Sequence, residues 1–139
     1  YFLSSLGSSI SFNSDFIEEV NALIESKGIE KITFVLSEDN KFVDDGIKNQ
    51  EFDNINDLRK LYKNISDHKR LTSKVYREKN IQKLVTSLLL KQKIKEMNLN
   101  LSDWLISKVN VDAKIYSRNN DSFNGVPNNL VEPNNVFLN

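Results

Sequence analysis

The spacing of apolar residues divides the N-terminal part of the chain into a strand, a helix and a second strand. Residues 1–6 and 31–36 are short runs rich in aromatic and β-branched side chains, which is typical of buried strands. Between them, Ser14 is placed as a helix N-cap and Gly28 as the left-handed residue after the last turn. The order strand, helix, strand predicts a βαβ unit with two parallel strands. The apolar face of its helix is formed by Phe16, Val20, Leu23 and Ile24.

The middle of the chain is predicted to be helical. Residues 37–54 are polar and rich in turn-forming residues, and a helix is predicted around residues 55–62. A longer helical region follows from residue 71 to residue 94, because apolar residues recur there at steps of three and four. We expect a break in it near residues 79–80, and its periodicity fades over residues 97–100.

The C-terminal part predicts a short helix and a pair of strands. The helix covers residues 101–108, and residues 111–117 alternate apolar and polar side chains as a strand does. Residues 122–126 can pair with that strand across a turn. We therefore expect one α/β domain over residues 1–125, with a small, mainly parallel sheet flanked by helices. An Asn- and Pro-rich tail over residues 126–139 should be extended or loosely attached.

Composition excludes several classes of chemistry. The chain has no Cys and one His, so disulfide frameworks, iron–sulfur clusters, zinc fingers and Cys nucleophiles are excluded. Its 139 residues, 39% of them apolar, suit one globular domain. No apolar run approaches the roughly 20 residues of a membrane span, and no signal-peptide pattern opens the chain. We expect a soluble, cytoplasmic protein with no cofactor and no membrane partner.

The nineteen basic and nineteen acidic residues are unevenly distributed. Residues 15–57 include twelve acidic and four basic side chains, whereas residues 59–95 include twelve basic and two acidic ones. Our interpretation is that the two segments attract one another within one fold. The alternative is that the basic stretch 59–95 binds nucleic acid or an acidic partner. The zero net charge of the whole chain disfavours nucleic acid.

The order of four segments resembles one known family. YFLSSLGSS at residues 1–9 resembles the second strand and the following loop of β-class carbonic anhydrases. FVLSEDNKF at residues 34–42 follows the helix where that family has a strand ending in two zinc ligands, a His and a Cys. Residues 80–100 are similar to the family's long helix, and residues 111–123 to its late strand and turn. The resemblance covers residues 1–125 in pattern and order, and it implies a β-carbonic-anhydrase-like sheet.

This sequence departs from the family at the metal site. In register, Glu38 stands at the zinc His position and Lys41 at the zinc Cys position, while Ser4 and Ser5 replace an Arg-Asn pair. A Lys ammonium has no lone pair to donate to a metal and adds a positive charge beside it. Without zinc, no bound water is activated for the hydration of carbon dioxide. We therefore expect no zinc and no carbonic anhydrase activity.

The resemblance also implies that a strand is missing. In the family the sheet order is 2-1-3-4, so its first strand lies between the strands that correspond to residues 1–6 and 31–36. Residues 1–139 include none that correspond to that strand. If no residues precede them, the two strands must pair directly or a partner must fill the gap; if residues upstream of Tyr1 supply a first strand, the family's sheet is restored. A homodimer is implied as well, although the family's dimer depends on N-terminal helices that these residues do not include.

Other candidate residues have ordinary interpretations. His68 has no second His or Cys with which to share a metal, and we expect it to be a surface histidine. The loop carboxylates could hold calcium or magnesium, but their spacing does not match an EF-hand. The serines around Gly7 could hold an anion, yet no phosphate-binding glycine motif is present. The carboxylates are Glu38, Asp39, Asp44 and Asp45, and the serines are Ser4, Ser5, Ser8 and Ser9.

Together these features predict a catalytically inactive carbonic-anhydrase-like domain that acts as a binding or structural module. Its cleft, near Ser4, Ser5, Glu38 and Lys41, would accept a small polar ligand. Binding of nucleic acid or an acidic partner by residues 59–95 is the alternative. A hydrolase built on the serine and acidic loops is the weakest hypothesis, because the single His lacks a partner in any evident motif.

Overall fold

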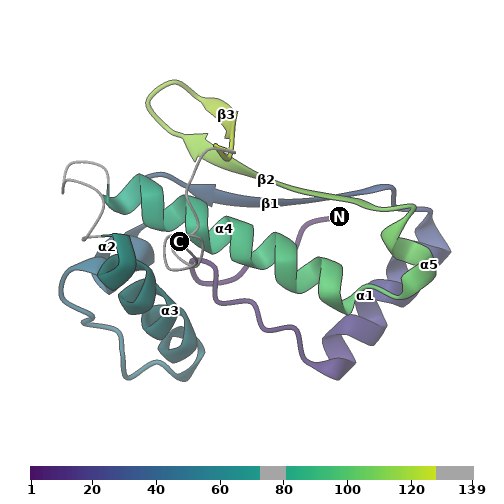
Figure 1. The fold of residues 1–139 in the computed structure, drawn as a ribbon, viewed down its shortest axis with the longest axis horizontal. Helices are drawn as coiled ribbons and strands as arrows, with labels where there is room; N and C mark the ends of the chain where they lie inside the picture. The colour runs from purple at the N-terminus through teal and green to yellow at the C-terminus, as the bar shows by residue number, and fades with distance from the viewer. Residues whose placement is uncertain (73–80, 128–139) are drawn as a thin grey trace, which may run out of the picture.

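A computed structural model describes residues 1–72 and 81–127, and its elements form two layers (Figure 1). The strands make one layer and the helices lie on one side of it, so the fold is a mixed α/β arrangement, as the sequence predicts. In chain order the elements are α1 (Ser14–Lys27), β1 (Lys31–Ser37), α2 (Lys41–Ile47), α3 (Asn56–Thr72), α4 (Ile81–Asn100), α5 (Asp103–Ile106), β2 (Asn110–Ser117) and β3 (Ser122–Gly125).

The sheet has three strands in the order β1-β2-β3. β1 and β2 run parallel, with Lys31 opposite Asn110, and β2 and β3 run antiparallel, with Ser117 opposite Ser122. The prediction of a mainly parallel sheet is therefore wrong, because one of the two pairings is antiparallel. The cause is local: the turn at residues 118–121 returns the chain directly beside β2, and a short connection can join only antiparallel neighbours.

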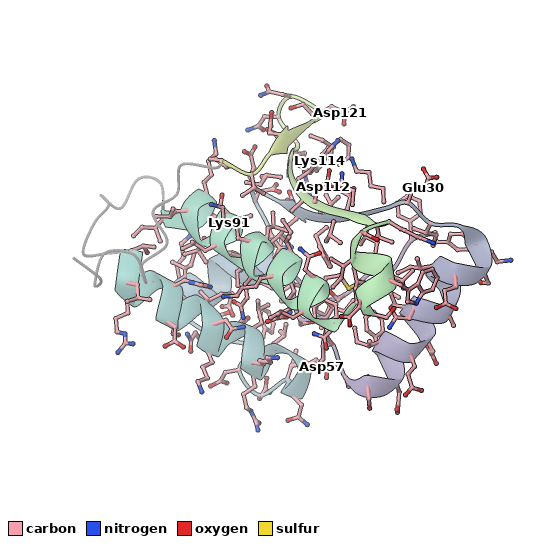
Figure 2. All side chains as sticks on the ribbon, turned by 45° about the vertical axis from the view of Figure 1, so that its right-hand side comes forward. Glu30, Asp57, Lys91, Asp112, Lys114 and Asp121 are labelled. Carbon is pink, nitrogen blue, oxygen red and sulfur yellow. The ribbon has the colours of Figure 1, made fainter. Side chains whose placement is uncertain are left out.

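The two faces of the sheet differ in polarity. Alternate side chains of a strand point to opposite faces, and the apolar set of β1 and β2 packs against the helices. The outer face carries polar side chains, among them Asp112 and Lys114 (Figure 2). Lys31 pairs with Asp112 there at 2.8 Å. The inward-facing residues are Ile32, Phe34 and Leu36 of β1 and Val111, Ala113 and Ile115 of β2.

Helix α4 lies at the centre of the helical layer. It contacts β1, β2, α2 and α3, and ten of its twenty residues are buried. Two apolar clusters meet along it. One joins α4 to α2, α3 and the carboxyl ends of the strands, and the other joins it to α1, α5 and their amino ends. Phe34 packs against both clusters, so the middle of β1 lies where the two halves of the core meet.

The predicted strand at residues 1–6 is wrong, and so is the βαβ unit built on it. These residues form no regular structure, and the side chains of Tyr1 and Phe2 are 84% and 107% exposed. The parallel neighbour of β1 is β2 instead. A strand needs main-chain partners, and among the described residues no backbone hydrogen bond joins residues 1–5 to β1. Apolar composition alone therefore did not make this segment a strand.

A turn at Gly7 fixes the path of the N-terminal segment. Gly7 has a φ of +59°, and a Cβ added there would lie 3.0 Å from Leu61 Cδ2 and 3.3 Å from Phe42 Cβ. Only glycine meets both requirements, because other residues rarely adopt this φ and would collide with α2 and α3. The turn thus packs against α2 and α3, and residues 1–5 run from it toward β1 (Figure 1).

The predicted helix at α1 is confirmed, with a one-residue correction at its start. The N-cap is Asn13 rather than Ser14, and its side chain accepts the N–H of Phe16 at 2.9 Å. Gly28 ends the helix in the left-handed conformation, as predicted, with a φ of 60°. An Asn accepts this hydrogen bond as well as a Ser does, so the sequence offered two equivalent caps side by side.

The polar stretch at residues 37–54 contains a helix that was not predicted. α2 begins after Asn40, whose side chain accepts the N–H groups of Phe42 and Val43. Val43 is fully buried and Gly46 packs against Ile65 of α3, so this one short turn supplies part of the core. A helix of seven residues is too short to give a clear periodic signal.

The remaining predicted elements correspond to α3, α4, α5, β2 and β3. α3 continues to Thr72, beyond the predicted end at residue 62, and α4 confirms the predicted helical region from residue 81 to residue 94 and continues to Asn100. The break predicted near Lys79 and Asn80 lies outside the described residues. So do residues 128–139 of the predicted tail. The two residues of the tail that are described, 126 and 127, follow β3 without regular structure.

The packing of His68 predicts a loss of stability in mild acid. Burial lowers the pKa of this imidazole below its ordinary value of 6.5, and this outweighs its hydrogen bond with Gln92 and the nearby charge of Asp67. Between pH 6.5 and the lower pKa that His68 has in the folded chain, unfolded chains therefore bind more protons than folded chains. We expect the free energy of unfolding to fall as the pH drops through this range.

Urea unfolding at pH 7.5 and pH 5.5 measures this loss. His68→Gln keeps a hydrogen-bonding side chain but cannot titrate, so its stability should change less between the two pH values. An imidazole NMR titration midpoint above 6.5 in the folded protein would contradict the assignment.

Candidate functional site

A groove of about 610 Å³ runs along β1. It lies between the N-terminal segment, helix α1 and strand β1, with side chains of α4 at its floor. We call it the β1 groove. Its lining includes Tyr1–Ser5, Gly7, Ser8, Ile10, Phe12, Phe16, Val20, Leu23, Ile24, Ile29, Lys31–Ser37, Asn40, Leu90 and Met97.

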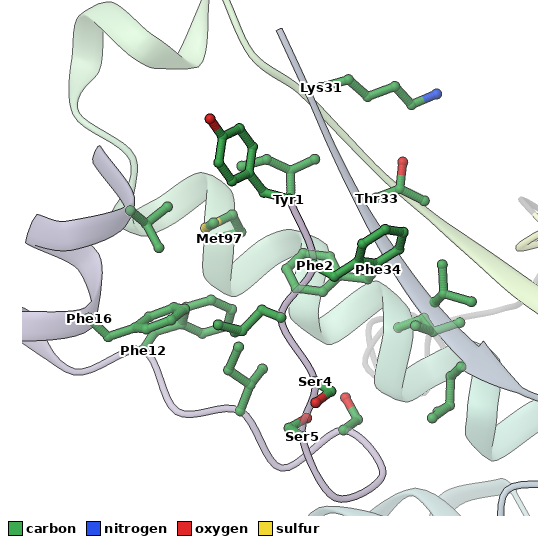
Figure 3. A pocket seen from close by; sticks show the side chains of 18 of the residues that line it. Tyr1, Phe2, Ser4, Ser5, Phe12, Phe16, Lys31, Thr33, Phe34 and Met97 are labelled. Carbon is green, nitrogen blue, oxygen red and sulfur yellow. The ribbon is translucent and has the colours of Figure 1, made fainter. Parts of the chain in front are cut away.

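Most of the lining is apolar. Phe12 and Phe16 stand side by side on one wall, with ring centroids 5.9 Å apart, as Figure 3 shows. Phe12 also meets Phe34 of β1 edge to face at 6.2 Å. The buried side chains of Leu90 and Met97 lie beneath them. A ligand in this groove would therefore bury apolar surface, which favours binding by about 25 cal/mol per Å² removed from water.

One end of the groove is polar. Ser4 and Ser5 lie there at the turn of the N-terminal segment (Figure 3), and Ser37 and Asn40 border the groove from the end of β1. The side chain of Asn40 is held by its role as the cap of α2, and the Ser37 hydroxyl donates to Asp39. The carboxyl end of a parallel strand thus meets the N-terminal turn, and this brings hydroxyl and amide groups to one end of an apolar channel.

The buried cation of Lys93 holds the wall formed by the N-terminal segment. Lys93 is only 4% exposed, and its Nζ donates to the carbonyl of Ile10 at 2.8 Å and pairs with Glu96 at 3.0 Å. The same Nζ lies 5.2 Å from the ring centroid of Phe12. One side chain of α4 therefore fixes both the backbone and an aromatic ring of the groove wall.

The four sequence-predicted site residues fall into two groups. Ser4 and Ser5 line the β1 groove. Glu38 does not, because its carboxylate accepts the hydroxyl of Ser117 from β2, and Lys41 is exposed at the first turn of α2. The structure therefore brings Ser4 and Ser5 together with Ser37 and Asn40, and it separates them from Glu38 and Lys41.

The remaining loop carboxylates each have a separate partner. The hydroxyl of Ser37 and the charge of Arg118, 3.3 Å away, hold the pKa of Asp39 below its ordinary value. Asp44 pairs with Lys48 at 2.8 Å. Within residues 1–72 and 81–127, no group of three or more His, Cys, Asp or Glu side chains is placed to hold a metal ion.

Asp45 closes the loop that follows α2. Burial raises the pKa of its carboxyl, but hydrogen bonds from the Tyr62 hydroxyl and from the N–H groups of Glu51 and Phe52 outweigh it and lower the pKa. The pKa of Tyr62 is raised by burial and by the same bond. This pair joins the loop to α3 and is a structural contact.

Part of the basic stretch 59–95 lies on α3. Arg59, Lys60 and Lys63 are exposed there, whereas Asp57 and Asp67 on the same helix interrupt the positive surface. Lys69 donates to the carbonyl of Ile47 at 2.7 Å. None of the four ion pairs found between described residues joins residues 15–57 to residues 59–95. The attraction predicted between the two segments is therefore not carried by these pairs.

Sequence reasoning missed the residues that shape the groove. Lys93 lies in the basic stretch 59–95, and nothing in the sequence marks it as buried, because a long charged side chain is rarely buried unless it is paired. Phe12 lies in a loop before α1 and belongs to no periodic pattern. Of the lining residues, the sequence marked Ser4 and Ser5 as site residues, whereas the apolar residues 1–3 were expected in a strand and are exposed instead.

Comparison with protein-family models, with curated proteins and with solved structures gives no match to this chain. Among the described residues, no helix combines the length and the apolar character that crossing a lipid bilayer requires.

Replacing Lys93 should loosen the groove wall. Lys93→Met removes the buried cation and leaves the Ile10 carbonyl and Glu96 without this partner, so we expect the free energy of unfolding to fall by about 2–4 kcal/mol. Limited proteolysis should also cut the segment before α1 faster.

Lys95→Met is the matched control, because Lys95 is exposed on the same helix two residues away. Urea unfolding and timed digestion of both variants measure the difference. Equal stability of the two variants would show that Lys93 does not anchor the segment.

Proposed function

We propose that this chain is a non-catalytic binding module that takes an elongated ligand, mostly apolar with one polar end, in the β1 groove. The observation that carries the proposal is the joining of an apolar channel of about 610 Å³ to a cluster of serine and asparagine side chains at one end. Concave, mainly apolar sites with a few polar groups that fix orientation are the usual form of ligand pockets.

The local chemistry favours binding over catalysis. The groove lining includes hydroxyl and amide groups and one cation, Lys31, but no carboxylate or imidazole. The only histidine, His68, hydrogen-bonds with Gln92 of α4, and neither residue belongs to the groove lining. A serine at the groove therefore has no general base among the lining residues to activate it as a nucleophile.

The relationship to β-class carbonic anhydrases is part of this proposal. The direct pairing of β1 with β2 supports one part of the strand order that the resemblance implies, whereas residues 1–6, the counterpart of the family's second strand, form no strand. Glu38 and Lys41 occupy the positions of two zinc ligands in that resemblance, and here Glu38 is engaged by Ser117. On this basis the domain would have lost the metal and kept a cleft.

Binding of a fluorescent apolar anion tests the proposal. We expect 1-anilinonaphthalene-8-sulfonate to bind the folded protein with one site per chain. Phe16→Ala should weaken binding at least about fivefold, because it removes one ring of the groove wall, and one buried aromatic contact contributes about 1 kcal/mol or more.

Phe52→Ala is the matched control. Phe52 packs on Phe42 at the same centroid distance of 5.9 Å but lies outside the groove lining. Equal effects of the two variants, or no saturable binding by a protein with native circular dichroism, would refute the proposed function.

The exposed basic residues of α3 favour a second candidate, the binding of an acidic partner. Arg59, Lys60 and Lys63 lie on the solvent side of this helix, whose other side is buried in the core. Such a contact would weaken steeply as salt is added, because exposed charges are screened.

Poly-glutamate and a DNA duplex are the probes for this surface. Arg59→Glu with Lys63→Glu should weaken binding about tenfold or more at low salt, while Lys27→Glu, at the end of α1, should change it little. No binding of either probe at low salt would remove this candidate.

A further inference from the structure

Strand β1 has a hydrogen-bonded neighbour on one side only. In the parallel ladder with β2, the N–H of Asn110 donates to the carbonyl of Glu30, and the N–H of Glu38 donates to the carbonyl of Tyr116. Main-chain groups of successive residues in a strand point to opposite sides. Both bonds therefore assign the even-numbered residues of β1 to the β2 side and the odd-numbered residues to the free edge.

The free edge offers main-chain donors and acceptors at three residues, Lys31, Thr33 and Val35. Ser37 ends the edge, because its carbonyl accepts the N–H of Asn40 at 3.2 Å. No backbone hydrogen bond joins residues 1–5 to β1 in the described part of the chain, although both segments line the groove. An edge of this kind is a template for an additional strand.

The groove runs along this edge. A cavity over one face of a strand touches every second residue, whereas the β1 groove is lined by all seven residues from Lys31 to Ser37. Val35, whose main-chain groups lie on this edge, is 50% exposed. The free main-chain groups and the apolar channel therefore belong to one site.

We infer that the occupant of the β1 groove is an extended peptide strand of a partner polypeptide, which adds to the free edge of β1. The unpaired main-chain groups repeat every second residue, about 6.6–6.8 Å apart, and an extended backbone has the same repeat. The inference rests on the proposed function, because it assigns a ligand class to the same groove.

The two faces of the added strand would meet different surroundings. Residues opposite each other in neighbouring strands share a face, so side chains beside Phe34 would lie over the apolar floor with Met97. Side chains beside Lys31 and Thr33 would lie on the polar outer face. The partner strand should therefore alternate apolar and polar residues over about five to seven positions.

A peptide with the sequence of β2, NVDAKIYS, is a suitable probe, because its alternation already matches β1 in the known register. Amide hydrogen exchange of the full chain gives the readout. Before the peptide is added, the amides of Thr33 and Val35 should exchange faster than those of Phe34 and Leu36. At saturation we expect exchange at Thr33 and Val35 to slow at least about tenfold, with no change at the even-numbered residues.

Two methylated peptides test whether the main chain is recognised. One carries N-methyl groups on its Val, Ala and Ile residues, and the other on its Asp, Lys and Tyr residues. Only one edge of a strand can face β1, so one peptide should lose binding and the other should keep it. Equal binding of both would overturn main-chain pairing.

Val35→Pro tests the protein side of the contact. Proline removes the N–H at the free edge and leaves the β1–β2 ladder intact, which edge strands tolerate. We expect this variant to bind the peptide about fivefold more weakly, the effect of one net hydrogen bond, while Val35→Ala stays within about twofold of the unmodified chain. Unchanged binding by the proline variant would refute the inference.

The outcomes separate this inference from the proposed function. Saturable dye binding without peptide protection at Thr33 and Val35 would leave a binding groove and remove the strand. Failure of both dye and peptide would remove both. If the amides of Thr33 and Val35 become protected with rising protein concentration and without peptide, the edge binds a second copy of the chain. If exchange at Phe34 and Leu36 changes when the peptide is added, the peptide displaces β2. Either result overturns the inference.

Discussion

The burial of helix α4 is the constraint on which the rest of the structure depends. This helix has the sheet on one side and α2 and α3 on another, and it carries both apolar clusters along its length. Ten of its twenty residues are buried, and consecutive residues such as Leu88, Leu89 and Leu90 are all among them. A helix buried on several sides has no narrow apolar stripe, which is why its hydrophobic residues are spread around it.

The same helix determines the shape of the groove through one polar contact. Lys93 reaches from α4 to the carbonyl of Ile10, and a buried cation requires such partners because removal from water is costly for an unpaired charge. The contact holds the N-terminal segment over the mouth of a space between α1 and β1. Residues 1–5 consequently run beside β1 without hydrogen bonding to it, and the free edge of β1 is part of the site.

The outer face of the sheet has a different character. Lys31, Asp112 and Lys114 make it polar, and within the described residues the helices lie only on the opposite side. Tyr116 and Phe123 form an aromatic pair there, with ring centroids 5.1 Å apart, and this pair joins β2 to β3. The polar outer face and the apolar groove meet at β1, so a ligand bound along that strand would contact polar side chains on one side and apolar side chains on the other.

Local patterns in the sequence determined most of the elements. Helical spacing placed α1, α3 and α4, the left-handed Gly28 ended α1, and alternation placed β2 with its hairpin partner, since each of these signals involves residues close in the chain. Ser4 and Ser5 were also marked as site residues from the sequence, and both line the groove.

Tertiary contacts decided what local patterns could not. Residues 1–6 have the composition of a strand, but a strand exists only where another backbone pairs with it, and that depends on Gly7 packing against α2 and α3. Lys is a residue type usually found at the surface, but Lys93 is buried because its ammonium group reaches the carbonyl of Ile10, 83 residues away in the chain. Pairing and burial join distant residues, so the three-dimensional fold alone made the groove and the free edge of β1.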